Sequence, residues 1–140
     1  MANDWEAMER DLFTQVRTGD GSITRGYFAG RQVLLLTTKG AKSGETRTTP
    51  LVYSHVGDKL VVIASKGGSP THPAWYHNLL AHPEATVEVG TERFRVTATV
   101  TTGEERQRLF DRQAAQMPIF VEYQHKTSRQ IPVLVLTRLD

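Results

Sequence analysis

Apolar residues near the start of the chain recur every three or four positions, which is the spacing of one face of an α-helix. They are Trp5, Met8, Leu12, Phe13 and Val16. This pattern predicts a helix over residues 3–17, opened by Asn3 and Glu6 as a capping pair. The opposite face is acidic rather than rich in lysine and arginine, so we expect the helix to pack on the protein itself and not on a membrane surface.

Later segments either alternate apolar and polar positions or are continuously apolar, and both patterns predict β-strands joined by tight turns. After a glycine-bearing connector that ends at Gly30, strands are expected over residues 31–38, 47–56, 60–64, 86–89, 94–100 and 131–139. Residues 60–64 are apolar at every position, so we expect this strand to be buried on both faces and to be the central one. Residues 86–89 and 94–100 alternate around Gly90 and Thr91, which is typical of a β-hairpin.

Two more helices are expected among these strands. Pro73 suits a helix start and Pro83 disfavours helix in the residue before it, so a short helix is predicted over residues 73–82. Thr102 with Glu105 predicts a second amphipathic helix, which is followed by a less regular segment up to Arg129.

The order of these elements predicts the fold class. Most consecutive strands are joined by short turns, so an antiparallel barrel fits better than a parallel βαβ fold. The predicted class is therefore mainly β with peripheral helices. We expect residues 1–30 to form an N-terminal helix and a flexible connector, and residues 31–140 to form the barrel domain.

Composition narrows the class of protein further. The chain has 140 residues, 17 Lys+Arg against 15 Asp+Glu, and no cysteine. A net charge of +2 is too small to coat a polyanion, so nucleic-acid binding is not expected. Without cysteine, thiol nucleophiles, cysteine-ligated zinc and disulfides are excluded, and a cytoplasmic location is the default expectation. The longest apolar run is residues 60–64, so stable membrane insertion is not expected either.

The histidines and serines do not form a familiar catalytic pattern. His72, His77 and His82 recur every fifth residue, which on a helix turns each by about 140° from the last. The three rings cannot share one ion, so no metal site is predicted. Ser65 lacks the G-x-S-x-G setting of an acyl-transfer nucleophile.

A glycine-bearing loop between the first two strands carries two cations. Ala41 stands where the Walker pattern needs glycine before its lysine, so a nucleotide-hydrolysing loop is not predicted. Backbone N–H groups beside Lys42, Ser43 and Arg47 would nevertheless bind a phosphate group well. From these residues alone, an exposed basic turn without a ligand is an equally good interpretation.

A second cluster of polar groups follows the most apolar strand. Ser65 and Lys66 come directly after that strand, and Trp75 follows on the predicted short helix. Hydroxyl and ammonium groups facing an indole would hold a planar ring and its polar edge. The alternative is that Trp75 only plugs the end of the barrel.

The sequence also resembles a known family, the deazaflavin-dependent nitroreductases, which use coenzyme F-420. The match runs from about Gln32 to Leu139. It consists of residues 36–44 with Arg47 and Pro50, then residues 64–68, 73–79, 81–83, 123–124 and 129–133. The resemblance implies a split β-barrel related to flavin-binding oxidases, which agrees with the antiparallel barrel predicted above.

The resemblance also implies site residues and a reaction. The residues assigned to the coenzyme are Lys42, Ser43, Gly44, Arg47, Pro50, Ser65, Lys66, Trp75 and Asn78. Ser65 and Tyr123 are assigned a catalytic role, as hydroxyls that stabilise or protonate the acceptor's oxygen. The implied function is an oxidoreductase that transfers hydride from reduced deazaflavin to a quinone, an enone or a nitro compound.

Some points stay open at this stage. Met117 and Phe120 accompany Tyr123, whereas members that reduce nitroimidazoles tend to present several tyrosines there. An FMN-dependent barrel oxidoreductase and a non-catalytic coenzyme or ligand carrier remain as alternatives. A monomer and a homodimer are both compatible with the sequence.

Overall fold

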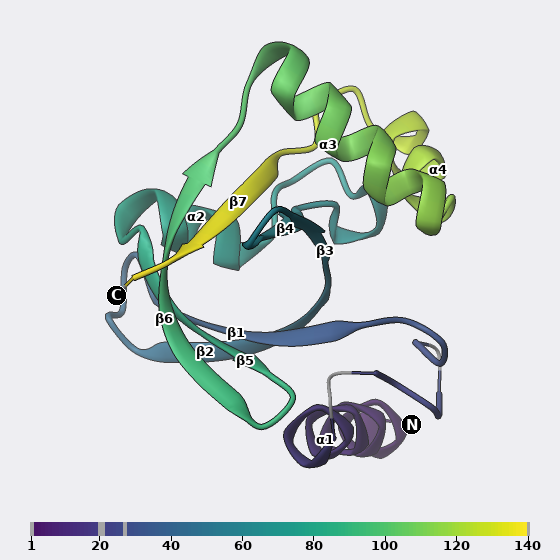
Figure 1. The fold of residues 1–140 in the computed structure, drawn as a ribbon, viewed down its shortest axis with the longest axis vertical. Coiled ribbons are helices and arrows are strands. Elements are labelled where there is room, and N and C mark those ends of the chain that lie inside the picture. The colour runs from purple at the N-terminus through teal and green to yellow at the C-terminus, as the bar shows by residue number, and fades with distance from the viewer. Residues whose placement is uncertain (1, 20–21, 27, 140) are drawn as a thin grey trace.

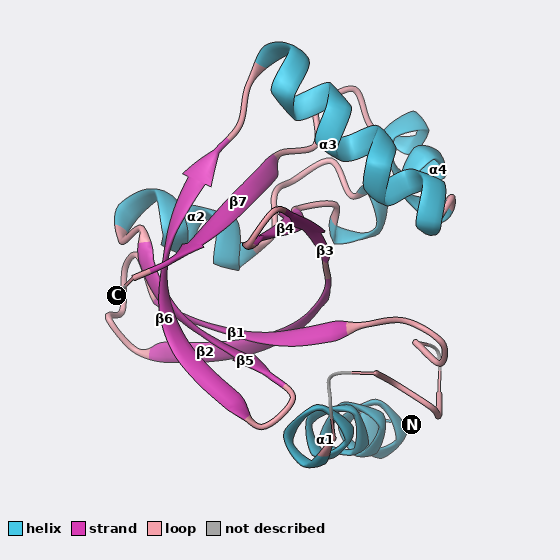
Figure 2. Cartoon of the chain, in the orientation of Figure 1, coloured by secondary structure: helices cyan, strands magenta, loops and turns pink. Residues whose placement is uncertain are grey.

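The computed structural model describes residues 2–19, 22–26 and 28–139, with side chains from residue 7 onward in the first range. One antiparallel sheet dominates these residues, in the strand order β2-β1-β5-β6-β7-β4-β3. Seen end-on it curls into a ring, with the helices outside (Figures 1 and 2). The strands are β1 (Val33–Lys39), β2 (Thr46–Val52), β3 (Ser54–Val56), β4 (Lys59–Ile63), β5 (Glu84–Val89), β6 (Glu92–Val100) and β7 (Val133–Arg138).

The chain itself closes this ring at Tyr53. The sequence predicted one strand over residues 47–56, but Tyr53 divides it into β2 and β3, which lie at opposite ends of the strand order. Val52 pairs with Val33 of β1, whereas Ser54 pairs with Val61 of β4. One continuous segment therefore connects the two edge strands of the sheet.

Strand β4 is buried on both faces, as predicted, but its expected central position is wrong. It lies next to the end of the strand order, and β6 is the middle strand. Leu60 and Val62 belong to the barrel interior, while Val61 and Ile63 belong to a second apolar cluster outside the barrel. Helices α3 (Gly103–Gln116) and α4 (Ile119–Lys126) form that cluster, so an outer helical layer accounts for the apolar run.

The predicted helices are confirmed, and one helix was not foreseen. The described helices include α1 (Ala2–Thr18) and α2 (Ala74–Ala81), close to the predicted ranges, and α3 begins directly after Thr102. The segment expected to be irregular contains α4. The predicted hairpin is confirmed as β5 and β6.

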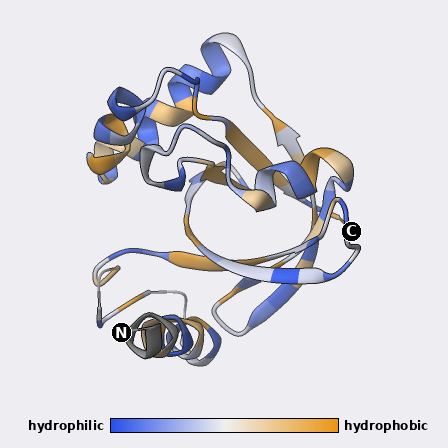
Figure 3. Ribbon diagram, turned by 180° about the vertical axis from the view of Figure 1, so that it is seen from behind, coloured by the Kyte–Doolittle hydropathy of each residue, from blue (hydrophilic) through white to orange (hydrophobic). Residues whose placement is uncertain are grey.

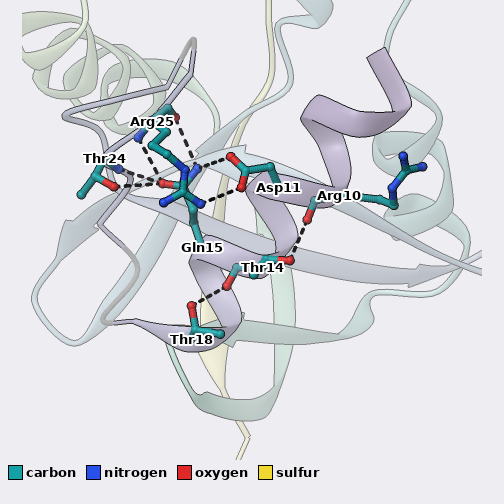
Figure 4. Close-up of polar contacts among 7 residues, drawn as sticks. All are labelled: Arg10, Asp11, Thr14, Gln15, Thr18, Thr24 and Arg25. Atoms are coloured by element: carbon teal, nitrogen blue, oxygen red, sulfur yellow. Dashed lines mark hydrogen bonds and ion pairs between the residues drawn. The ribbon is translucent and has the colours of Figure 1, made fainter. Parts of the chain in front are cut away.

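Helix α1 lies outside the barrel, on the side opposite α3 and α4 (Figure 1). Its Leu12 and Val16 pack on Ile23, Val33 and Leu35 in a third, separate apolar cluster. Polar contacts complete this attachment, and Figure 4 shows those made by Asp11 and Gln15 with the connector. The described residues of the connector are held by backbone hydrogen bonds, such as the one from Gly30 to the Ile23 carbonyl at 2.7 Å.

Apolar stretches alternate with polar ones along the strands that form the barrel wall, and the helices also carry both colours (Figure 3). This distribution follows from the inward-facing positions of the strands, which fill the barrel with side chains. None of the helices in the described part of the chain has the length and apolar character that crossing a membrane requires.

Candidate active site

A cavity of about 330 Å³ opens beside the barrel, between β2, the turn after β4, the start of α2, the residue after α3, and helix α4. Five of the site residues assigned from the sequence lie together in its lining. They are Pro50, Ser65, Lys66, Trp75 and Tyr123. The sequence had taken them from four separate segments, so the fold brings these segments to one place.

The walls of this cavity are mostly apolar. Its lining includes Leu51, Val52 and Ile63 from the strands, and Met117 and Phe120 beside Tyr123. The Phe120 and Tyr123 rings meet edge to face, with centroids 5.9 Å apart. A cavity with flat apolar walls and a few polar groups at one rim is suited to a planar heteroaromatic ring.

The polar rim is a bend in left-handed backbone conformation, which we call the cavity bend (residues 65–68). It includes the 3₁₀ turn η1 (Lys66–Gly68), where φ is 47° at Lys66, 64° at Gly67 and 82° at Gly68. A Cβ atom on Gly68 would lie 2.8 Å from the Tyr123 carbonyl oxygen and 2.9 Å from Lys126 Cβ. Only glycine allows this approach, which brings α4 and its Tyr123 against the cavity bend.

Arg129 also holds the cavity bend, through its guanidinium. Its guanidinium donates hydrogen bonds to the carbonyl oxygens of Ser65 at 2.7 Å, Ser69 at 2.9 Å and Ala64 at 3.3 Å. It also contacts His72 Nδ1 at 2.9 Å. Burial lowers the pKa of Arg129, yet a guanidinium stays charged at any physiological pH. Sequence reasoning gave Arg129 no role, although it stands in the last block of the resemblance.

The second group of assigned residues lies on the turn between β1 and β2, which we call the cationic loop (residues 40–47). Lys42, Ser43, Gly44 and Arg47 are all exposed and do not line the cavity. The turn is closed by two backbone hydrogen bonds, from Gly40 to the Glu45 carbonyl at 2.8 Å and from Gly44 to the Gly40 carbonyl at 3.0 Å. Gly44, with φ at 75°, supplies the left-handed conformation that this turn requires.

Asn78 connects the cationic loop with the cavity. Its Oδ1 accepts a hydrogen bond from the Ala41 N–H at 3.0 Å, and its Nδ2 donates to the Thr38 hydroxyl at 3.1 Å. Asn78 is buried on α2, one turn after Trp75, so a single helix carries both the loop anchor and the cavity wall. The amide therefore positions the loop, and direct contact of Asn78 with the coenzyme stays a prediction.

Strand β2 provides the second connection. Arg47, Thr49 and Leu51 share one face of this strand because side chains alternate along it, and two residues span about 7 Å. Residues 49–52 of this strand all line the cavity, so both faces of β2 contribute to it. Arg47 lies two residues before this stretch, in the part of β2 that belongs to the cationic loop.

The fold and the site together define a split-barrel protein with an open pocket beside the barrel. The model of the F420H2-dependent quinone reductase family matches residues 8–138 of the chain. This chain therefore belongs to that family, and it is an oxidoreductase that depends on coenzyme F-420.

Individual relatives agree with this assignment. A Mycobacterium tuberculosis protein named as an F420H2-dependent quinone reductase is 44% identical over 110 residues, which cover 75% of this chain and 72% of that protein. The solved structure of a reductase dependent on reduced F-420, FDR-A, is 41% identical, with a TM-score of 0.68, and the match covers 74% of this chain and 92% of that one. Another solved structure, described as a domain-swapped dimer, is 35% identical with a TM-score of 0.70, covering 97% of this chain and 99% of that one. The split-barrel fold class predicted from the sequence is thereby confirmed.

Proposed function

We propose that this enzyme reduces a quinone or a related activated alkene, with coenzyme and acceptor both bound in the cavity beside Ser65 and Tyr123. The observation that carries the proposal is the gathering of Pro50, Ser65, Lys66 and Trp75 in one apolar cavity. The cationic loop is tied to the same helix through Asn78.

The residues present fit a deazaflavin coenzyme. A flat tricyclic ring suits the walls formed by Pro50 and Trp75, and its polar edge suits the Ser65 hydroxyl and the Lys66 ammonium. Gly67 lines the same rim, and a Cβ there would meet nothing within 4 Å, so the bend leaves space at the polar edge. The exposed cations Lys42 and Arg47 suit the coenzyme's phosphate.

When bound, reduced coenzyme F-420 supplies a hydride. The chain's own residues orient the two reactants and exclude water. Apolar side chains such as Met117 and Phe120 line the acceptor's side of the cavity and keep it dry. The hydroxyl of Ser65 or Tyr123 donates a hydrogen bond to the acceptor's oxygen as negative charge develops there.

Ser65→Ala tests this assignment. Arg129 holds Ser65 by its backbone carbonyl, so alanine keeps the cavity bend in place. We expect kcat to fall roughly 100-fold while coenzyme affinity changes little, because an oxyanion donor acts mainly in the transition state. Unchanged turnover would assign Ser65 to packing alone.

Acceptor choice follows from the same walls. Met117 and Phe120 offer no hydroxyl where additional tyrosines would stand, so quinones and enones are proposed as better acceptors than nitroimidazoles. A menadione and a nitroimidazole assay at equal concentration compares the two classes. A nitroimidazole rate equal to the menadione rate would contradict this order.

One experiment separates the reductase from its alternatives. The purified protein is titrated with oxidised coenzyme F-420 and with FMN, and whichever ligand binds is then reduced and mixed with menadione. We expect binding of F-420 only and rapid oxidation of its reduced form. Binding of FMN would favour an FMN enzyme, and F-420 binding without oxidation by any acceptor would favour a carrier.

We also propose a homodimer in the cytoplasm. Support for the dimer comes from the relative described as domain-swapped and from the separate apolar cluster through which α1 attaches to the barrel. Light scattering of the purified protein measures the mass directly, and a monomer at all concentrations would contradict the proposal. The cytoplasmic location rests on the absence of cysteine and stays a prediction.

A further inference from the structure

Arg129 makes three hydrogen bonds to the backbone in and around the cavity bend. Its guanidinium binds the backbone carbonyls of Ser65, the first residue of the bend, and of the two flanking residues, Ala64 and Ser69. Three carbonyls held by one planar group fix the spacing between the ends of the bend. The groups between them, Lys66 and Gly67, line the cavity.

Arg129 is itself held in place by α4 and the turn after it. Its carbonyl accepts a hydrogen bond from Gln124 Nε2 at 2.8 Å, and its N–H donates to the Thr127 hydroxyl at 3.3 Å. The same α4 carries Tyr123. A shift of Arg129 would therefore move Ser65 relative to Tyr123, the two hydroxyls that the proposed reaction uses.

His72 completes the contact set of the guanidinium. The 2.9 Å contact joins Arg129 Nη1, which can only donate, to His72 Nδ1, which must then be the unprotonated, accepting nitrogen. A protonated imidazole has no acceptor to offer and carries a charge of the same sign as the guanidinium. The contact therefore requires neutral His72.

Resting on the reductase function proposed above, we propose that Arg129 is a positioning residue for hydride transfer, and that protonation of His72 releases it and disorders the cavity bend. The enzyme would then lose activity in acid through a residue that touches neither coenzyme nor acceptor. Nothing in the reaction itself requires this histidine.

The surroundings of His72 keep it neutral near pH 7. Burial, the charge of Arg129 and the nearby His77 all lower its pKa below the usual value. The charged or titratable groups of the described residues that face it are Arg129, Tyr76 and His77 of α2, and Lys66, which reaches the adjacent Thr71 at 3.2 Å. None of these is a carboxylate, so no facing group favours the charged imidazole.

The first test needs no coenzyme. Amide ¹H–¹⁵N spectra of the free protein are recorded from about pH 8 down to pH 5, the range in which imidazoles titrate. The Lys66, Gly67 and Gly68 signals are expected to move with the midpoint of the His72 ring. In His72→Asn, whose Oδ1 still accepts a hydrogen bond, they should stay in place. Signals that ignore His72, or that move equally in His72→Asn, overturn the pH-dependent release.

The second test uses turnover with reduced F-420 and menadione. Arg129→Met should lower kcat/KM roughly 10- to 100-fold, mostly in kcat, because a misplaced bend spoils alignment more than affinity. Arg129→Lys should recover part of that loss. We expect the wild type to lose activity between about pH 6.5 and pH 5, and His72→Asn should remove this loss.

His77→Asn is the matched control. His77 lies on the same helix with its ring 5.8 Å from His72, but it makes no hydrogen bond to Arg129 among the described residues. This variant should keep the acid loss of the wild type, with the midpoint moved to slightly higher pH because His77 no longer lowers the pKa of His72. An acid loss that persists in His72→Asn overturns the release by His72, and a wild-type kcat in Arg129→Met overturns the positioning role of Arg129. If the wild type does not oxidise reduced F-420 with menadione, the proposed function is overturned. The amide spectra then decide by themselves whether His72 controls the bend.

Discussion

The cavity bend and the cationic loop are both turns between secondary-structure elements, yet they are held in different ways. The bend is fixed by Arg129 on one side and by the close approach of Gly68 to α4 on the other. Among the described residues, the cationic loop makes one hydrogen bond to a side chain outside itself, donated by the Ala41 N–H to Asn78 Oδ1, and its cations are exposed.

This difference matches what each turn is proposed to hold. Hydride transfer depends on the placement of the ring to within a fraction of an ångström, so the groups at its edge need fixed positions. A phosphate is recognised largely by charge, which tolerates small movements and acts over a longer range. The predictions below test this contrast, beginning with the largest expected effect.

Gly68→Ala should disrupt the bend most. The added Cβ would meet the Tyr123 carbonyl and Lys126 at under 3 Å, and φ of 82° disfavours any side chain. We expect a loss of about 2–4 kcal/mol in the free energy of unfolding, together with a lower kcat. Urea unfolding and turnover measure the two effects.

Gly67→Ala is the matched control for this change. Gly67 has a similar φ of 64°, but a Cβ there meets nothing within 4 Å. Its stability loss should be only the conformational cost, about 1–2 kcal/mol. Equal stability losses in the two variants would mean that the contact with α4 is not what fixes the bend.

Arg47→Ala should affect the other turn through binding rather than stability. The exposed guanidinium is proposed to make a charge-assisted bond to the coenzyme's phosphate, so its loss should weaken coenzyme affinity roughly 10- to 100-fold. Fluorescence titration with F-420 measures this. Arg93→Ala on β6 removes the same charge from an exposed site and should leave affinity unchanged.

Asn78→Ala tests whether the cationic loop needs its hydrogen bond to Asn78 in order to bind the coenzyme. The variant leaves the Ala41 N–H and the buried Thr38 hydroxyl without their partner. Coenzyme affinity should fall roughly 5- to 30-fold, the equivalent of about 1–2 kcal/mol. Thr38→Val removes only the second contact and should cost less, whereas an equal loss in both variants would assign the effect to the core rather than to the loop.

Much of this architecture could be predicted from periodicity and turn residues. The antiparallel class, the hairpin and α1, α2 and α3 followed from local patterns. The position of β4 did not, because an apolar run records burial on two faces without saying what covers each face. Helix α4 was also missed, since its short segment mixes aromatic and charged residues with no clear stripe.

The site residues likewise divide into those that local sequence patterns predicted and those that they missed. Short motifs pointed to the cavity residues, because their side chains carry recognisable chemistry. Arg129 stayed without a role because its effect depends on four partners between residues 64 and 72, about 60 positions away in sequence. Tyr53 as the closing point of the barrel is equally non-local, since only the pairing partners of β2 and β3 reveal it.

Arg17→Ala should have the smallest effect on stability. It tests whether α1 is attached to the barrel by charge or by apolar contacts. The Arg17–Glu88 ion pair, 3.0 Å long, joins α1 to β5, with Arg17 half exposed. Exposed pairs of this kind contribute about 0.2–1 kcal/mol. Val16→Ala removes a fully buried side chain of the same helix and should cost about 1–3 kcal/mol. Urea unfolding compares the two, and a larger loss for Arg17→Ala would mean that charge, rather than the apolar cluster, attaches α1.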